Sequence, residues 1–416
     1  MTKTSLRILI VGGGPGGLCL AQGLRQAGID VALYERDATA VFRKQGYRLH
    51  IDERGAGPLR ACLPAHLFEL FTATASARSH QVTVLNKQLK TLKVIGSPKL
   101  EATTQTSFSA GVDRLTLRDI LLTSLEGVVF FGKEFTHYEQ LSDGSVQAYF
   151  ADGTTARGDV LVGADGVNSR IRQQFLPDAT PVDTGSRCIY GKVLLTDATR
   201  PFIPDPLYHG FTQVVSSHAS LALGLIAFPR PPIEIAAQLA PEVQLHTTGS
   251  YLMWSLNTRS APFVSSDDEL FRMGGTALLQ KVLQYIKSWH PNLQALMAAG
   301  DPAEIFPIAV RVAAPCEPWQ SNSITLLGDA IHAMSPAGGS GANMALHDAH
   351  LLCEALISVA RFEQPLTQAI HAYEAQMLKD GFEAVRFSSQ GGVLHNASTP
   401  RKRSWLPALL PFARRT

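Results

Sequence analysis

The sequence lacks the features that mark several large protein classes. It has no apolar run of about 18 residues, so we expect no membrane-spanning helix. Its 37 Lys and Arg nearly balance 35 Asp and Glu, and a net charge of +2 gives no broad basic surface for nucleic acid. Only 17% of residues are charged and 45% are hydrophobic, which excludes wholesale disorder. The 416 residues allow about two or three domains, or one large domain with an insertion.

Cysteine is scarce and scattered. The five cysteines are odd in number and form no CxxC pair, so a disulfide framework, a zinc site and disulfide-reductase chemistry are not expected. They are Cys19, Cys62, Cys188, Cys316 and Cys353. We also find no Ser-His-Asp arrangement, HExxH helix or Walker loop, which removes three other kinds of active site. Ordinary reduced or buried thiols, and no metal site, are the expectation.

A strand, a glycine-rich turn and a helix are predicted at the N-terminus. Leu6–Val11 is rich in Ile, Leu and Val, as is typical of a strand buried on both faces in a parallel sheet. Residues 12–17 contain five glycines, and Leu18–Ala27 then has a helical pattern. Because the glycines follow so soon, we interpret the apolar stretch as a strand and not as a signal peptide, and we expect a cytoplasmic protein.

The turn fits the GxGxxG pattern, with Gly12, Gly14 and Gly17 in the three required places. The first glycine permits a tight turn, the second lets the backbone approach a pyrophosphate, and the third lets helix and strand pack closely. The next predicted strand, Val31–Tyr34, ends at Glu35, whose carboxylate can accept hydrogen bonds from both ribose hydroxyls of an adenosine. A carboxylate there repels a 2′-phosphate, so FAD or NAD is favoured over NADP; a glycine-rich turn without a ligand is the alternative.

Two later segments separate FAD from NAD. Residues 159–170 are a predicted strand that ends in a tight turn at Asp165-Gly166. A second buried strand ends at Gly328-Asp329, before a Pro-x-x-Gly-x-Gly-x-Asn stretch over 336–343 and a helix over about 342–357. With the glycine turn, these segments resemble, in order and spacing, the three motifs of the group A FAD-dependent flavoprotein monooxygenases, the aromatic hydroxylases. Residues 113–118 resemble the helix start with Arg and Leu that touches the flavin in this family.

The resemblance implies a Rossmann-like α/β FAD-binding domain, discontinuous in sequence, with an inserted β-sheet substrate domain. We expect the FAD-binding domain over 1–75, 106–175 and 285–395, the substrate domain over 76–105 and 176–284, and a tail over 396–416. A β-meander is expected over 128–155, further strands over 81–95, 189–195, 213–215, 221–228 and 251–256, and helix over most of 277–299. The basic tail could touch a membrane surface, although a docked or frayed tail is the simpler interpretation.

The residues expected at the cofactor follow from the motifs. They are Gly12, Gly14, Gly17, Glu35, Arg36, Arg48, Arg114, Asp165, Gly328, Asp329, Gly341, Ala342 and Asn343. Asp329 is expected to bind a ribityl hydroxyl, and the helix that starts near Gly341 to aim N–H groups at the pyrimidine end of the flavin. The segment after Glu35 does not align firmly, so either Arg43 or Arg48 is a candidate, and Arg36 is expected to be solvated or to lie along the adenine.

Each of these side chains also has a simpler structural interpretation. Asp329 could cap the next segment, Asp165 could make an Asx turn, and Arg114 could pair with a surface acid. We expect His332 and His347, which flank the Gly-Asp motif, to be packed or capping residues rather than bases. The candidate substrate residues are Phe211, Phe228, Tyr251, Met253 and Trp254, although such residues are more often ordinary core.

The resemblance implies an FAD-dependent monooxygenase. In this family NAD(P)H reduces FAD during a transient visit, and the absence of a second GxGxxG fits that behaviour. Reduced flavin then takes O₂ to form a flavin hydroperoxide, whose distal oxygen attacks a small electron-rich aromatic or polycyclic substrate. The protein orients the substrate and excludes water. The substrate, the choice of NADH or NADPH, the catalytic acid or base and the oligomeric state do not follow from the sequence.

Two other classes stay open. A flavin-dependent reductase or dehydrogenase of the same fold would not insert oxygen. Escort proteins for prenylated GTPases share the fold and can lose flavin, but the intact Gly328-Asp329 motif argues against that class. The four isolated tryptophans argue against flavin halogenases, which carry a Trp-x-Trp motif.

Overall fold

The apolar run near the N-terminus forms the central strand of a five-stranded parallel sheet. The computed structural model describes residues 6–40, 47–77, 81–96, 107–246, 248–259 and 266–390. In spatial order the strands are β17 (Ile324–Leu326), β11 (Val160–Gly163), β1 (Arg7–Val11), β2 (Asp30–Tyr34) and β7 (Val129–Phe130), and all neighbours are parallel. Ile8, Leu9 and Ile10 are fully buried, as expected for a parallel sheet covered on both faces. The predicted Rossmann-like α/β unit is confirmed.

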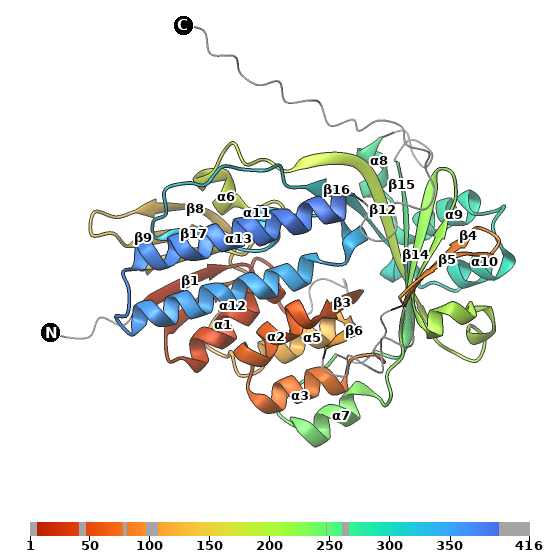
Figure 1. Cartoon of the computed structure of the whole chain (residues 1–416), viewed down its shortest axis with the longest axis horizontal. Helices are drawn as coiled ribbons and strands as arrows, with labels where there is room; N and C mark the ends of the chain where they lie inside the picture. Colours follow the sequence, from red (N-terminus) through yellow and green to blue (C-terminus); the bar gives the residue numbers. More distant parts are fainter. Residues whose placement is uncertain are drawn as a thin grey trace, which may run out of the picture.

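Three long helices form the layer beside this sheet. They are α1 (Pro15–Gln26), α12 (Gly341–Ala360) and α13 (Leu366–Ser389), and α12 runs between the other two (Figure 1). Helix α1 approaches α12 closely because Gly23 has no side chain; a Cβ there would lie 2.6 Å from Sγ of Cys353. The helices predicted over 18–27 and 342–357 are confirmed, with ends shifted by a few residues.

The predicted β-meander is also confirmed. It is a three-stranded antiparallel sheet of β8 (Phe135–Gln140), β9 (Val146–Phe150) and β10 (Thr155–Gly158). Gly144 and Gly153 occupy its two turns with φ of +85° and +80°, a conformation that glycine adopts without strain.

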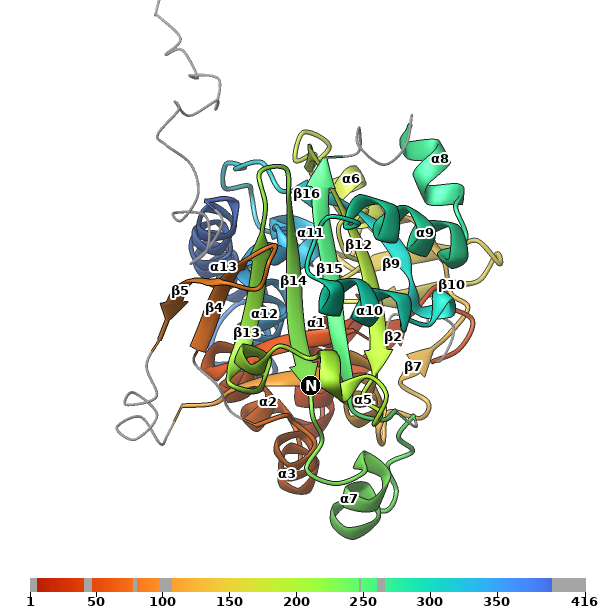
Figure 2. The same cartoon turned by 90° about the vertical axis from the view of Figure 1, so that its right-hand side faces the viewer.

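A seven-stranded mixed sheet forms the second half of the molecule, seen nearly edge-on in Figure 1 and face-on in Figure 2. In spatial order its strands are β16 (Phe306–Val312), β12 (Val182–Leu194), β15 (Tyr251–Arg259), β14 (Ala219–Ile226), β13 (Gly210–Val215), β4 (Gln81–Asn86) and β5 (Thr91–Ile95). Only the β13–β4 pair is parallel. Strand β16 lies within the range that the sequence assigned to the FAD-binding domain, yet it pairs with β12 in this sheet.

Helices cover the outer face of the large sheet. Figure 2 shows α9 (Gly275–Tyr285) and α10 (Pro291–Ala298) in front of the strands. Leu278, Leu293 and Trp254 are among the side chains that share the buried core between helices and sheet. This core is separate from the one around the parallel sheet, so each half of the molecule has its own packing.

A short antiparallel pair lies where the two halves meet. It consists of β3 (Arg48–Asp52) and β6 (Ser109–Asp113), and it contacts α12 on one side and β14 on the other. The remaining α-helices are α2 (Glu53–Cys62), α3 (Ala65–Ala73), α5 (Arg114–Leu122), α6 (Arg170–Phe175), α7 (Pro232–Leu239), α8 (Asp267–Arg272) and α11 (Asp329–His332). The 3₁₀ turns are η1 (Arg200–Phe202), η2 (Asp205–Tyr208), η3 (Pro302–Glu304) and η4 (Pro336–Gly338).

Several expectations concern features outside these elements. No helix in the described ranges is long and apolar enough to cross a bilayer. The five cysteines are free thiols, and within the same ranges no cluster of three or more His, Cys, Asp or Glu side chains could hold a metal ion. The C-terminal tail and Arg43 lie outside the described residues.

Tight packing between β12 and β15 allows a test of the hydrophobic core between the large sheet and helices α9 and α10. Gly191 faces Trp254 across the strands, and a Cβ at Gly191 would lie 2.1 Å from Cζ2 of the fully buried indole. We expect Gly191→Ala to lower the free energy of unfolding by about 1–3 kcal/mol, because the ring has no free space to enter. Urea denaturation measures this. Gly249→Ala is the matched control, since its new Cβ would meet nothing closer than 3.9 Å; equal stability of the two variants would contradict the packing.

Candidate functional site

One large cavity lies between the parallel-sheet half and the seven-stranded sheet. Its volume is about 3080 Å³, against roughly 300–1,000 Å³ for typical small-molecule pockets. The glycine turn after β1, the β3–β6 pair, the segment 327–345 and the inner faces of β13, β14 and β15 all contribute to its wall. The space is large enough for an extended cofactor and a second molecule at the same time.

The three glycines of the turn have different roles. A Cβ on Gly12, which has φ of +114°, would lie 2.2 Å from the carbonyl oxygen of Ala164, and a Cβ on Gly17 would lie 2.1 Å from that of Gly12. Both glycines therefore permit close backbone packing. Gly14 differs, because it lines the cavity, has open space where a Cβ would be, and is the N-cap of α1. That position suits a phosphate group at the helix N-terminus.

Glu35 ends β2 with both carboxylate oxygens already oriented. Oε2 accepts a hydrogen bond from the backbone N–H of Gly13 at 2.7 Å, and Oε1 accepts one from that of Asp37 at 2.9 Å. Each oxygen keeps a second lone pair for a ribose hydroxyl. The side chain of Arg36 is exposed, and neither Glu35 nor Arg36 lines the cavity as it stands.

Asp165 has a structural role, although its bond is not the Asx turn that the simpler sequence interpretation named. Its Oδ2 accepts a hydrogen bond from the backbone N–H of Arg170 at 2.8 Å, at the start of α6. Oδ1 is buried without a hydrogen-bond partner among the described residues, and burial raises the pKa of the carboxyl above its ordinary value. Its neighbours Ala164 and Gly166 line the cavity, whereas Asp165 itself does not.

Arg172 donates hydrogen bonds to the segments that follow two of the sequence motifs. It was not among the residues predicted from the sequence. Its guanidinium is buried and donates from one nitrogen to the carbonyl oxygen of Val167 at 3.0 Å and from another to that of Ala330 at 2.7 Å. The first carbonyl follows the Asp165-Gly166 turn and the second follows Gly328-Asp329. No motif marks an arginine at this place, so only the folded arrangement identifies it.

Asp329 presents its carboxylate to the cavity. The side chain is exposed to that space, yet enclosure by the surrounding protein raises its pKa above the ordinary value, against the opposing charges of His332 and Arg114. The carboxylate of Asp329 accepts no hydrogen bond within the described ranges. A Cβ on Gly341 would lie 3.7 Å from its Oδ1. The carboxylate is thus an available acceptor beside the N-terminus of α12.

A buried ion pair supports the Gly-Asp motif from behind. His332 and Asp348 are both fully buried, and Nε2 of His332 lies 2.6 Å from Oδ2 of Asp348. The same oxygen accepts the backbone N–H of Gly328 at 2.8 Å, where φ is +60°. Burial lowers the pKa of His332, but the Asp348 carboxylate outweighs that effect and the net shift is upward. His332 is packed as expected; Asp348 was not anticipated.

The start of α12 lines the cavity with backbone. Gly339, Gly341 and Ala342 lie on the wall. Asn343 is different: it is fully buried, its Oδ1 accepts the N–H of Asp52, and its Nδ2 donates to the carbonyl oxygens of His50 and Gly339. It holds β3 against α12 and does not reach the cavity. Arg114, at the start of α5, lies on the wall with its guanidinium 5.2 Å from the ring centre of Tyr47.

The candidate substrate residues divide between the two faces of the large sheet. Phe211 and Met253 line the cavity. Trp254 is fully buried in the core under α9 and α10, so it lies on the opposite face, and Phe228 is not on the cavity wall. Tyr251 is fully buried and donates its hydroxyl to Oδ2 of Asp113 at 2.8 Å.

Polar side chains on the inner face of this sheet were missed. Gln213, Ser255 and Asn257 line the cavity, and His218 lies on it at the β13–β14 turn. Ser255 and Asn257 alternate with Trp254 and Leu256 along β15, as strand geometry requires. That alternation was visible in the sequence, but it does not say which face meets the cavity.

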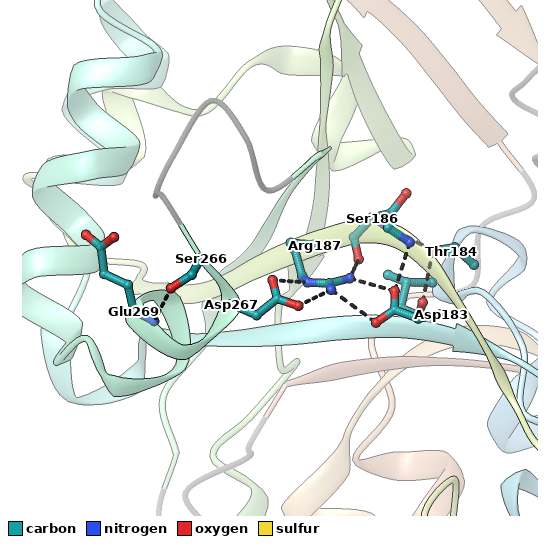
Figure 3. A network of polar contacts seen from close by, with 9 residues as sticks. Asp183, Thr184, Ser186, Arg187, Ser266, Asp267 and Glu269 are labelled. Carbon is teal, nitrogen blue, oxygen red and sulfur yellow. Dashed lines mark hydrogen bonds and ion pairs between the residues drawn. The ribbon is translucent and has the colours of Figure 1, made fainter.

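The outer rim of the cavity is held by a charged network around Arg187 (Figure 3). Asp183, Thr184 and Ser186 line the cavity at an irregularity of β12. The buried guanidinium of Arg187 donates to Oδ1 of Asp183 and Oδ1 of Asp267, both at 2.8 Å, and these bonds raise its pKa further. Asp267 begins α8, so the network fixes this helix to the rim.

The chain is similar in sequence and in structure to known FAD-dependent proteins. A family model described as FAD binding domain matches residues 5–186 and 284–388, more than half of the chain. A dual O-methyltransferase/FAD-dependent monooxygenase from Phaeosphaeria nodorum is 32% identical over 93% of this chain, and 6-hydroxynicotinate 3-monooxygenase from Pseudomonas fluorescens is 27% identical over 96% of this chain and 94% of that one. The solved structure of a proposed FAD-containing monooxygenase from Photorhabdus luminescens has 32% identity and a TM-score of 0.78, over 94% of this chain and 98% of that one. The chain belongs to the group A FAD-dependent flavoprotein monooxygenases.

The family binds FAD, and the cavity offers a site that this cofactor fits. The residues on its wall fit that cofactor, because Gly14 leaves room for a pyrophosphate at a helix N-terminus and Asp329 offers a free acceptor to a hydroxyl. The chain spans 45% of the Phaeosphaeria protein, so it corresponds to less than half of the length of that dual-function relative.

The His332–Asp348 pair gives a pH-dependent prediction. A histidine whose pKa is raised on folding stabilises the protein fully below its unfolded pKa of about 6.5, and this stabilisation is lost as the pH rises through the folded pKa. We expect Asp348→Asn to lower the free energy of unfolding by about 3–5 kcal/mol at pH 6, and by less at pH 9.

Urea denaturation between pH 6 and pH 9 measures both effects. Asp380→Asn is the matched control, because its pair with His347 at 3.1 Å is partly exposed and is expected to contribute at most about 1 kcal/mol. A stability loss in Asp348→Asn that is the same at every pH would contradict the assignment of a charged His332.

Proposed function

We propose that this chain is an FAD-dependent monooxygenase that uses NAD(P)H and O₂ to hydroxylate a small electron-rich aromatic or polycyclic substrate. One observation carries the proposal: a single cavity runs from the glycine turn at Gly14, past Asp329, to Phe211 and Met253 on the inner face of the large sheet. Two of the expected cofactor residues, Gly14 and Asp329, therefore share one space with an apolar wall for a second molecule.

Residues of the glycine turn and of the Gly328-Asp329 motif, together with the acid that ends β2, would hold FAD. Gly14 and the N-terminus of α1 would bind the pyrophosphate, Glu35 the adenosine ribose, and Asp329 a ribityl hydroxyl. The backbone of Gly341 and Ala342 would lie against the flavin ring, where the N-terminus of α12 favours negative charge. Bound FAD supplies the transfer of two electrons from NAD(P)H and the activation of O₂, chemistry that no side chain can provide.

The large sheet would position the substrate and keep water out. Phe211, Met253 and Val82 give an apolar wall, on which a flat ring can lie, and Gln213 and Asn257 offer polar groups for its substituents. The described ranges contain no second nucleotide-binding unit after the glycine turn, which supports transient use of NAD(P)H at the same cavity.

The relatives support an aromatic substrate. The Pseudomonas protein is named for 6-hydroxynicotinate, a hydroxylated aromatic ring, and the Phaeosphaeria protein combines an FAD-dependent monooxygenase with an O-methyltransferase. Hydroxylation of an aromatic ring yields a phenol, which is a chemically suitable acceptor for O-methylation.

Oxygen labelling tests the reaction. The purified chain is incubated with FAD, NADH or NADPH and aromatic candidates under ¹⁸O₂, and products are analysed by mass spectrometry. We expect a stimulating compound to accelerate NAD(P)H oxidation and to acquire one ¹⁸O atom. Turnover with no label in the product would instead favour a reductase or dehydrogenase of the same fold, and a chain that rejects added FAD would contradict both.

Asp329 gives a residue-level test of cofactor binding. We expect Asp329→Ala to raise the FAD dissociation constant about 10- to 100-fold, because a ribityl hydroxyl loses a charged acceptor. Fluorescence titration of the apoprotein with FAD measures the change. Asp268→Ala, at an exposed carboxylate on α8, is the control that should bind FAD like the unmodified chain; equal affinities for all three proteins would remove Asp329 from the site.

A further inference from the structure

Arg48 extends from the β3–β6 pair onto the large sheet. Two glycines make room for its side chain. A Cβ on Gly224 of β14 would lie 2.6 Å from Cδ of Arg48, and a Cβ on Gly111 of β6 would lie 2.6 Å from its Nε. Arg48 therefore packs directly against the backbone of the substrate sheet, in a slot that any larger residue at either position would narrow.

The surroundings of Arg48 belong to the substrate side of the cavity. Its guanidinium carbon lies 5.7 Å from the ring centre of Phe211 on β13. Gly224, beneath the side chain, pairs across the strands with Met253, so both residues are at the same level of the sheet. Arg48, Phe211 and Met253 all line the cavity. A ring lying on Phe211 and Met253 would thus have a guanidinium beside it.

The charge of Arg48 has no anionic partner within the described ranges. No ion pair involves it there, and its Nε is buried without a hydrogen-bond partner. Asp113, which lies opposite Arg48 on the paired strand, already has partners of its own: its Oδ2 accepts from Tyr251 and its Oδ1 from the backbone N–H of Thr116. Burial lowers the pKa of Arg48 to about 10, so it is still a cation at neutral pH.

Two other arginines on the cavity wall are neutralised or bonded within the protein. Arg54 pairs with Asp52 at 2.6 Å, and Arg311 donates to Oδ1 of Asn168 at 2.6 Å. A buried cation without such a partner lowers the free energy of unfolding, unless a ligand supplies the opposite charge.

We propose that Arg48 binds a carboxylate or phenolate group of the aromatic substrate, which makes aromatic anions the substrate class of this enzyme. The planar guanidinium matches a carboxylate with two parallel hydrogen bonds and leaves the adjacent ring free to stack on Phe211. This assigns Arg48 to the substrate and not to the cofactor, where the motif analysis placed it. The inference rests on the proposed function, because it takes the inner face of the sheet as the substrate surface.

A pair of probes that differ mainly in charge tests the assignment. Salicylate carries a carboxylate and a phenol on one ring, and salicylamide has nearly the same shape without the carboxylate charge. Each is titrated by calorimetry into the full chain in the presence of FAD. We expect the unmodified chain to prefer salicylate, and Arg48→Gln to weaken salicylate binding about 10- to 100-fold with little change for salicylamide.

Three further variants separate the charge of Arg48 from other effects. Gly224→Ala keeps the charge but displaces the side chain, so it should also weaken salicylate binding selectively. Arg48→Lys should retain part of the preference for salicylate, because lysine keeps the charge but lacks the planar guanidinium that makes two parallel hydrogen bonds. Arg272→Gln removes an equal charge from an exposed site on α8 and should change neither probe.

The outcomes also distinguish substrate binding by Arg48 from a role of Arg48 in FAD binding, and from failure of the monooxygenase reaction. FAD affinity should be unchanged in Arg48→Gln; a loss of FAD affinity with the salicylate preference intact would assign Arg48 to the flavin and overturn the proposal. No preference in the unmodified chain, or full preference in Arg48→Gln, would also overturn it. The titration needs no turnover and can be repeated without FAD, so failure of the monooxygenase reaction would show only in the oxygen-labelling experiment.

Discussion

The close contact between Gly12 and Ala164 is the constraint on which the site depends. The backbone of the glycine turn passes so near the end of β11 that no side chain fits between them. Since β1, β11 and β17 are parallel neighbours, their carboxyl ends share one edge of the sheet, and the three segments that follow them meet there. Arg172 then bonds the second segment to the third. Residues that are more than 300 positions apart in sequence, Gly14 and Asp329, therefore line one cavity.

Buried charge follows a consistent pattern around this edge. Charges behind the cavity wall are satisfied inside the protein: His332 pairs with Asp348, and Arg172 donates to backbone carbonyls. Two charges that face the cavity, those of Asp329 and Arg48, have no hydrogen-bond or ion-pair partner within the described ranges. Such groups cost stability unless a ligand satisfies them, which supports the two proposed contacts: a ribityl hydroxyl at Asp329 and a substrate anion at Arg48.

The sequence predicted the parts of this arrangement that depend on local pattern. Leu6–Val11, the glycine turn and the Gly328-Asp329 segment carry their own periodicity and turn chemistry, and each forms the predicted element. The sequence carries no comparable local pattern for the pairing of strands that are far apart in the chain. Strand β16 joins the large sheet across more than 100 residues, and Trp254 and Met253 are neighbours whose opposite faces could not be assigned before the sheet was known. Asp348 and Arg172 act through contacts made only on folding, so no motif marks them.

A crystal structure of the chain with FAD would test the central claim most directly. The account predicts one FAD molecule in the cavity, with its adenosine ribose at Glu35, its pyrophosphate at Gly14 and its ribityl chain at Asp329, and with the flavin ring facing the sheet that carries Phe211 and Met253. FAD bound elsewhere on the chain, or in this cavity without contact to both Gly14 and Asp329, would contradict it.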